Sequence, residues 1–159
     1  TYGGVSYPGL EADDLNAFVM YYCGDVNSDT YINMSIDKDV LKSVWGKWFN
    51  FKKFESGETS IDDALKFLFI QALMGDSTDN ITGIPKVGEV KATKIIESCE
   101  SINEMRSRVL AEYCKYYKSS SVGIYEFQKN FRQVYLLRKN QDFINEVGYI
   151  PKLPKLRQI

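Results

Sequence analysis

Seven acidic residues in three short motifs are the part of this sequence best suited to chemistry. Ionised carboxylates repel one another, so acids that gather at one place usually have a cation among them. Ligands that are all oxygen favour Mg²⁺ or Mn²⁺, and the sequence contains no histidine. Two such ions about 4 Å apart activate a water and stabilise the leaving oxygen in phosphodiester hydrolysis. The candidate metal ligands are Glu11, Asp13, Asp14, Asp37, Asp39, Asp76 and Asp79, and all but Asp79 are also candidate catalytic residues.

The stretch over residues 74–92 predicts a hairpin that holds a nucleic-acid backbone. An apolar run over residues 64–74 is typical of a buried helix, and Gly75 follows it where helices often end. Two further glycines mark a tight turn before the next helix, whose N-terminus and turn amides suit a phosphate. The alternative is a helix-turn-helix corner with solvated caps. The candidate DNA contacts are Gly83, Lys86, Gly88, Lys91 and Lys94.

The elements expected to position these residues are mostly helices. We expect a strand over residues 31–36, and side chains that alternate along its exit would point Asp37 and Asp39 the same way. The alternative is a turn in which Asp37 caps the segment 40–44. Residues 45–58 are expected to be irregular, with lysines and aromatic side chains that either contact nucleic acid or pack inward. Helices are predicted over about 9–23, 60–74, 89–98, 101–117 and 124–139, with a linker over 119–123 and an extended tail from 140.

Composition favours one ordinary domain in a reducing compartment. The chain has 159 residues, and its three cysteines are widely spaced, which indicates free thiols and a cytoplasmic location. The net charge of −1 hides an asymmetry, because residues 1–85 hold 13 acidic and 6 basic residues while residues 86–159 hold 8 acidic and 14 basic ones. An acidic half joined to a basic half suits a protein that gathers cations at one place and phosphates at another.

The three motifs together resemble the 5′ nucleases. This family includes flap endonucleases, the 5′-nuclease domains of bacterial DNA polymerases, the ribonuclease H of T4-like phages and the 5′→3′ exonucleases of T7-like phages. The resemblance implies the mostly helical C-terminal portion of a PIN-like α/β nuclease domain with a helix-hairpin-helix. It implies a phage or bacterial replication enzyme, in the host cytoplasm if it comes from a phage. The residues that carry the match lie in 8–14, 35–39 and 75–84, with Val87, Gly88 and Ala92.

The resemblance also implies roles for single residues. Glu11 and Asp13 correspond to ligands of a first Mg²⁺, and Asp37, Asp39 and Asp76 to ligands of a second. Asp14 and Asp79 correspond to further acids around the two ions. The hairpin in such enzymes often holds K⁺ or Na⁺ with its turn carbonyls. Two departures from the family pattern are Lys86 in place of the first hairpin glycine, and Val90 at the usual lysine position with Lys91 one place later.

The sequence therefore predicts a Mg²⁺-dependent 5′→3′ exonuclease or flap endonuclease that acts on DNA or RNA–DNA. The family's N-terminal half, with further metal ligands, has no counterpart here. We therefore expect a fragment, or one subunit completed by a second polypeptide. The expected division is a metal-binding nuclease region over residues 1–75, a hairpin region over 76–118, and a C-terminal helix with its basic tail over 119–159. The alternative is a non-catalytic DNA-binding subunit, and a PIN-type ribonuclease is disfavoured because PIN toxins lack the hairpin.

Overall fold

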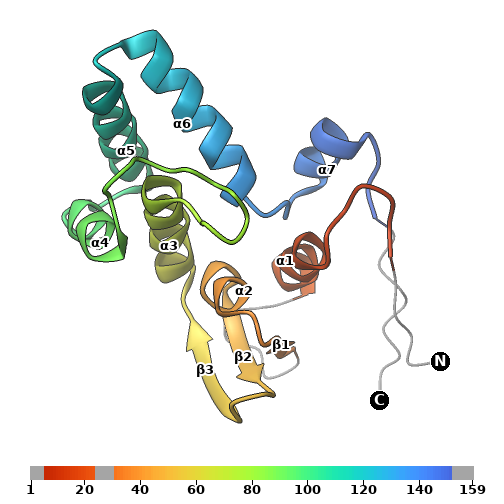
Figure 1. Cartoon of the computed structure of the whole chain (residues 1–159). Coiled ribbons are helices and arrows are strands. Elements are labelled where there is room, and N and C mark those ends of the chain that lie inside the picture. Colours follow the sequence, from red (N-terminus) through yellow and green to blue (C-terminus); the bar gives the residue numbers. More distant parts are fainter. Residues whose placement is uncertain (1–5, 24–30, 152–159) are drawn as a thin grey trace. The chain divides into compact units, whose positions relative to one another are not determined.

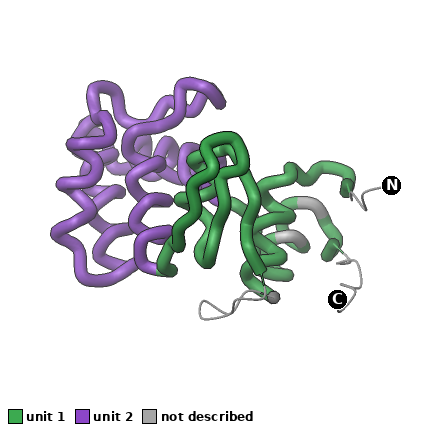
Figure 2. Tube along the Cα trace, turned by 90° about the horizontal axis from the view of Figure 1, so that it is seen from below, with its two compact units in different colours: residues 1–61, 136–159 green, residues 62–135 purple. Residues whose placement is uncertain are grey.

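The computed structural model describes residues 6–23 and 31–151 of the chain. The elements, labelled in Figure 1, are α1 Ala12–Cys23, β1 Asn33–Met34, α2 Lys38–Ser43, β2 Gly46–Asn50, β3 Glu55–Thr59, α3 Ile61–Met74, α4 Glu89–Glu97, α5 Ile102–Tyr117, α6 Ser120–Val134 and α7 Asn140–Val147. Packing divides the chain into two compact units, residues 1–61 with 136–159 and residues 62–135 (Figure 2). The predicted division into three regions follows sequence motifs and stays a prediction.

The first unit contains a small three-stranded sheet in the order β1-β2-β3. Strand β1 pairs in parallel with β2, and β2 pairs with β3 in an antiparallel hairpin that runs from Gly46 opposite Thr59 to Asn50 opposite Glu55. Helices α1 and α2 pack through a cluster of buried apolar side chains, with the partly buried Leu136 against it. The C-terminal segment therefore belongs to the same unit as the N-terminal one. The cluster consists of Ala17, Met20, Val40 and Val44.

Two predictions in this unit are wrong. Residues 45–58, expected to be irregular, form the β2–β3 hairpin, and Gly57 leaves room for the Trp48 ring, which a Cβ there would meet at 2.5 Å. The strand expected over residues 31–36 is only Asn33–Met34, and Met34 is exposed. The reason is that Asp37 ends the extended stretch by capping α2, so Asp39 lies inside a helix rather than on a strand exit.

The second unit is a bundle of helices around two clusters of buried apolar side chains, with Phe131 packed against both. Helix α3 is buried over most of its length, as its continuous apolar sequence predicts. Tyr113 of α5 is fully buried, and its hydroxyl donates a hydrogen bond of 2.6 Å to the carbonyl of Ala72. Burial raises the pKa of Tyr113, so the hydroxyl stays protonated as that bond requires. The core includes Phe69, Leu73, Ile84, Val87, Ile96, Met105, Val109, Tyr113 and Phe127.

The C-terminal third differs most from the sequence prediction. The expected linker 119–123 is the start of α6, because Ser119 caps the helix by accepting from the amide of Val122. Helix α6 ends at Val134 rather than near residue 139. Residues 140–147, expected to be extended, form α7, where the Asp142 carboxylate accepts from the amides of Arg138 and Lys139.

Other expectations about the chain ends have mixed outcomes. The Tyr149 hydroxyl donates to the carbonyl of Pro8 at 2.7 Å, which ties this stretch of the C-terminal segment back to the N-terminal one. The expectations for residues 24–30 and for the basic tail 152–159 lie outside the described residues. None of the described helices combines the length and apolar character that crossing a membrane requires.

The contact between α5 and α6 gives a test of the fold. A Cβ at Gly123 would lie 2.6 Å from the Cα of Cys114, so the two helix backbones must separate to accept a side chain. Although Ala ordinarily favours a helix over Gly by about 1 kcal/mol, we expect Gly123→Ala to lower the free energy of unfolding by about 1–3 kcal/mol. Urea unfolding measures the change. The exposed neighbour Val122→Ala is the control, expected within about 0.5 kcal/mol of the wild type.

Candidate nucleic-acid and metal site

The predicted hairpin begins where α3 ends. Gly75 adopts a φ of +72°, the left-handed conformation that commonly ends a helix. Asp76 and Ile81 then exchange both backbone hydrogen bonds, at 2.8 and 2.7 Å, and so close a turn over the residues between them. The Asp76 carboxylate accepts from the amide of Thr78 at 2.8 Å, which stiffens that turn. The helix end and turn that the glycine predicted are therefore confirmed.

Gly83 fixes the hairpin to the helix it leaves. A Cβ at Gly83 would lie 2.3 Å from the amide nitrogen of Gly75, so no other residue permits this backbone approach. The next amide, of Ile84, donates to the carbonyl of Leu73 at 2.8 Å. The Gly83 amide donates to Oδ1 of Asn130, on α6, at 2.9 Å. Because this amide is already engaged, Gly83 positions the hairpin, and its predicted contact with DNA stays untested.

A second tight turn leads into α4. The amide of Val87 donates to the carbonyl of Ile84, with Pro85 at the second position and Lys86 at the third. Lys86 has a φ of +66°, and proline holds the preceding φ near −65°, which together define a type II turn. That third position usually requires glycine. Lysine is strained there, but the turn forms and leaves the Lys86 side chain exposed.

The N-terminus of α4 is open to the surface. Gly88 caps the helix with no side-chain hydrogen bond, and nothing lies within 4 Å of where its Cβ would be. Lys91 and Lys94, both exposed, border a shallow depression of about 430 Å³ beside Gly88. A helix N-terminus carries partial positive charge and amides that favour an anion. The candidate DNA contacts other than Gly83 therefore surround one helix end.

Two candidate acids of the first unit, Asp14 and Asp37, accept hydrogen bonds from backbone amides. Asp14 accepts from the amide of Glu11 at 3.4 Å and from that of Leu137 at 2.9 Å, so it ties the C-terminal segment to α1. Asp13 lies in the first turn of α1. Oδ1 of Asp37 caps α2 by accepting from the Asp39 amide at 2.8 Å. Capping accounts for one oxygen of Asp37, and its exposed carboxylate leaves the other able to accept.

The candidate metal ligands of the second unit are Asp76, in the hairpin, and the exposed Asp79, in its turn. Their oxygen-only chemistry suits Mg²⁺, as it does for the acids of the first unit. No group of three acidic, histidine or cysteine side chains among residues 6–23 and 31–151 lies together in a way that could hold a metal ion. The metal site and the ligand roles of all seven acids therefore stay predictions.

Sequence reasoning missed Asn130. Its Oδ1 accepts from Gly83, its Nδ2 donates to the carbonyl of Glu126 at 2.8 Å, and the side chain is 1% exposed. Asparagine is uncommon inside helices because it competes for backbone hydrogen bonds. An asparagine between Phe127 and Phe131, in the apolar stripe of α6, is the signal that could have identified a buried polar contact.

Comparisons with known proteins identify sequences that this chain resembles. Residues 64–141 match the model of a family described as 5'-3' exonuclease, C-terminal SAM fold. The 5'-3' exonuclease of Buchnera aphidicola subsp. Acyrthosiphon pisum is 28% identical over 113 residues, which cover 66% of this chain and 39% of that protein. DNA polymerase I of Lactococcus lactis subsp. cremoris is 32% identical over 113 residues, 62% of this chain and 13% of the polymerase. The flap endonuclease of Escherichia phage T5 is 28% identical over 96 residues, 55% of this chain and 33% of the phage protein.

The described chain is mostly helical with one small three-stranded sheet, and the match over residues 64–141 assigns its helical part to the C-terminal domain of a 5'-3' exonuclease. With the family match over residues 64–141, the resemblance to the 5′ nucleases is confirmed. The chain spans well under half the length of these relatives, 39% of the Buchnera exonuclease. No solved structure matches the chain.

The bond between Asn130 and Gly83 gives a test of how the hairpin is held. Asn130→Ala leaves the buried Gly83 amide without its acceptor, and we expect the free energy of unfolding to fall by about 1–3 kcal/mol. The Gly83 amide should also lose most of its protection in hydrogen exchange measured by NMR. Gln133→Ala, exposed on the same helix, is the control and should change neither quantity. Unchanged protection of the Gly83 amide in Asn130→Ala would show that another group holds the hairpin.

Proposed function

We propose that this chain is the C-terminal portion of a Mg²⁺-dependent, structure-specific 5′ nuclease, acting as a 5′→3′ exonuclease or flap endonuclease on DNA or RNA–DNA. The observation that carries the proposal is the N-terminus of α4, where Gly88 opens the helix end and Lys86, Lys91 and Lys94 are exposed around the hairpin. The family of residues 64–141 supports the nuclease assignment. We expect the enzyme to act in the cytoplasm, of the host if it is a phage protein.

The hairpin can bind a phosphate by two independent effects. The first turn of α4 offers backbone amides and the positive end of the helix dipole. The lysines add charge that attracts the backbone regardless of base sequence. Binding of this kind positions a duplex without reading its sequence, as a nuclease that recognises structure requires. A K⁺ ion held by the turn carbonyls would strengthen the contact by placing further positive charge beside the phosphate.

The acids would supply the metal site. We propose that Glu11, Asp13 and Asp14, with Asp37, Asp39, Asp76 and Asp79, hold two Mg²⁺ or Mn²⁺ ions together with ligands from the rest of the enzyme. When bound, such ions activate water and stabilise the leaving oxygen. Within this chain, hydrogen bonds fix the carboxylates of Asp37 and Asp76 before any ion binds, one at a helix cap and one in a turn. Fixed ligands lose less freedom on binding a cation.

We further propose that cleavage requires residues outside this sequence. The chain corresponds to 39% of the Buchnera exonuclease, and among residues 6–23 and 31–151 no three acidic side chains gather as a metal site would require. The remaining ligands would come from another segment of the same protein or from a second polypeptide. The DNA substrate would then contact both this chain and the part that supplies the remaining ligands, and the hairpin would hold it on this chain.

A second candidate is a DNA-binding subunit without catalysis. The observation that favours it is that Asp14, Asp37 and Asp76 each have hydrogen bonds that explain them without a metal. A binding subunit would need these acids for structure alone. The nuclease needs the charge of the carboxylates to bind metal ions, whereas the binding subunit needs only their hydrogen bonds. A substitution that removes the charge but keeps the hydrogen bond therefore distinguishes the two candidates.

Asp37→Asn is that substitution. Asparagine caps helices as well as aspartate, so we expect the thermal unfolding midpoint to stay within a few degrees of the wild type. Loss of the charge should lower Mg²⁺-dependent cleavage of a 5′-labelled flap substrate on the order of 100-fold or more, in an assay that includes the polypeptide completing the enzyme. Asp62→Asn, in the first turn of α3, is the matched control. Full cleavage by Asp37→Asn would favour the binding subunit.

Lys86→Gly separates the charge of the hairpin from its conformation. Removing the strain of the positive φ should raise the free energy of unfolding by about 1 kcal/mol. The extra freedom of glycine in the unfolded chain offsets much of this gain, so the free energy of unfolding should be unchanged or slightly higher. DNA affinity at low salt should fall about 3–10-fold through loss of one phosphate contact. The control is Lys118→Gly, since Lys118 has a φ of +52° at the end of α5. Equal DNA affinity in the two variants would remove Lys86 from the interface.

A further inference from the structure

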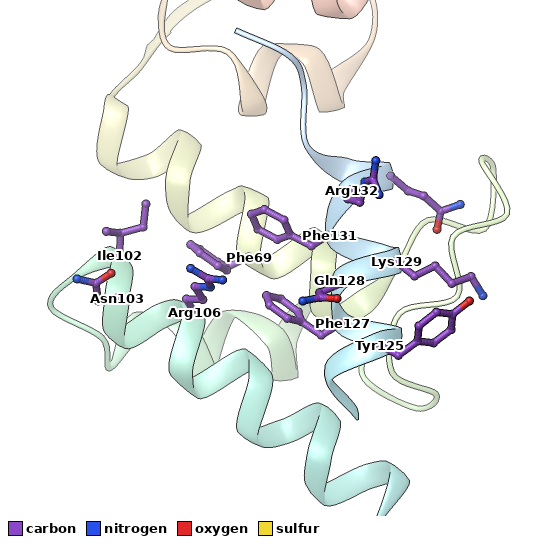
Figure 3. Close-up of a pocket in the computed structure, with 11 residues that line it drawn as sticks. Phe69, Ile102, Asn103, Arg106, Tyr125, Phe127, Gln128, Lys129, Phe131 and Arg132 are labelled. Atoms are coloured by element: carbon purple, nitrogen blue, oxygen red, sulfur yellow. The ribbon is translucent and has the colours of Figure 1, made fainter. Parts of the chain in front are cut away.

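The second unit has a groove that the proposed nuclease function does not use. It has a volume of about 850 Å³ and lies between α5 and α6, with α3 beneath it (Figure 3). Every residue that lines it comes from these three helices, so the groove lies wholly within one compact unit. The hairpin lysines do not line it. The groove is therefore distinct from the candidate DNA contact at α4.

The floor of the groove is aromatic and well packed. Phe69 and Phe127 are 2% and 4% exposed, and both have ring centroids within 5.6 Å of that of the partly buried Phe131. Tyr125 and Ile102, which also line the groove, are 64% and 48% exposed. Large exposed apolar side chains beside a concave apolar floor are typical of a binding surface.

The charged groups around this floor have one sign. Arg106 comes from α5, and Lys129 and Arg132 come from α6 (Figure 3). No acidic residue is among the described residues that line the groove. The Lys129 ammonium forms an ion pair with the Glu126 carboxylate, with Nζ 3.5 Å from Oε2. Arg106 has no ion-pair partner within residues 6–23 and 31–151. Arginine beside an apolar pocket is typical of the residues that dominate binding energy at protein interfaces.

We propose that this groove docks a short acidic peptide segment of a partner protein. An aromatic or aliphatic side chain of the segment fills the groove over Phe69, Phe127 and Phe131, and a flanking aspartate or glutamate pairs with Arg106. Charge complementarity selects the acidic segment. A single-stranded nucleic acid has the right charge but needs open ring faces for its bases, and the rings of Phe69 and Phe127 are almost completely buried while Phe131 is partly buried. An apolar floor therefore fits a peptide side chain better than a base.

The test measures fluorescence anisotropy of labelled peptides with the full chain. The probes are peptides in which phenylalanine or leucine alternates with aspartate, versions with lysine in place of aspartate, and versions with serine in place of the apolar residues. We expect the acidic apolar peptides to bind and both altered versions to bind at least 10-fold more weakly. Arg106→Glu should weaken the acidic peptides about 10-fold or more. Arg108→Glu makes the same charge change on the same helix outside the groove, and it should have little effect.

Several results would overturn the proposal. Absence of binding by every acidic apolar peptide is one, and equal weakening by Arg106→Glu and Arg108→Glu is another. Equal binding of the serine versions would show attraction by charge alone. A labelled single-stranded oligonucleotide that loses affinity in Arg106→Glu and displaces the peptides would assign the groove to nucleic acid. Because Arg106 is exposed, the variant should fold, and its circular dichroism spectrum verifies this.

Discussion

The close approach of Gly75 and Gly83 is the constraint on which the second unit depends. The two backbones meet at a distance that excludes a side chain on either residue, and Asn130 secures the approach from α6. The chain that leaves α3 is thereby turned back at once, and Ile84 and Val87 enter the core beside Leu73. The type II turn at Lys86 then starts α4 in one defined place. The geometry of the α4 N-terminus is thus set by contacts buried beneath it, which would give the proposed phosphate contact a rigid support.

The first unit combines structure and proposed chemistry differently. Its acids cap helices or tie segments together, as Asp14 does with Leu137 and Asp37 with α2. A carboxylate has two oxygens and several lone pairs, so one oxygen can accept from an amide while the other binds a cation. Hydrogen bonds of this kind orient the ligands of metal sites in general. The structural roles of these acids are therefore compatible with the proposed metal site.

Local signals in the sequence predicted the elements that local interactions determine. Gly75 ended α3 as expected, Ser101 capped α5, and Gly88 began α4. The β2–β3 hairpin was missed because its lysines and aromatic residues do not alternate, so that only the pairing between the two strands reveals it. Ser119 resembled a linker residue because a cap and a turn favour the same residue types. The bond from Asn130 to Gly83 joins residues 47 positions apart, and no short-range pattern could have predicted it.

The central claim is that the end of α4 and the hairpin lysines bind a nucleic-acid backbone. The most direct measurement is the salt dependence of duplex DNA binding by the chain and by the triple variant K86A/K91A/K94A. Each phosphate contact contributes about 0.9 to the slope of log affinity against log salt concentration. If all three lysines contact phosphates, the slope of the variant is shallower by about 2.7. A slope equal to that of the wild type would contradict the account and assign DNA binding to another surface.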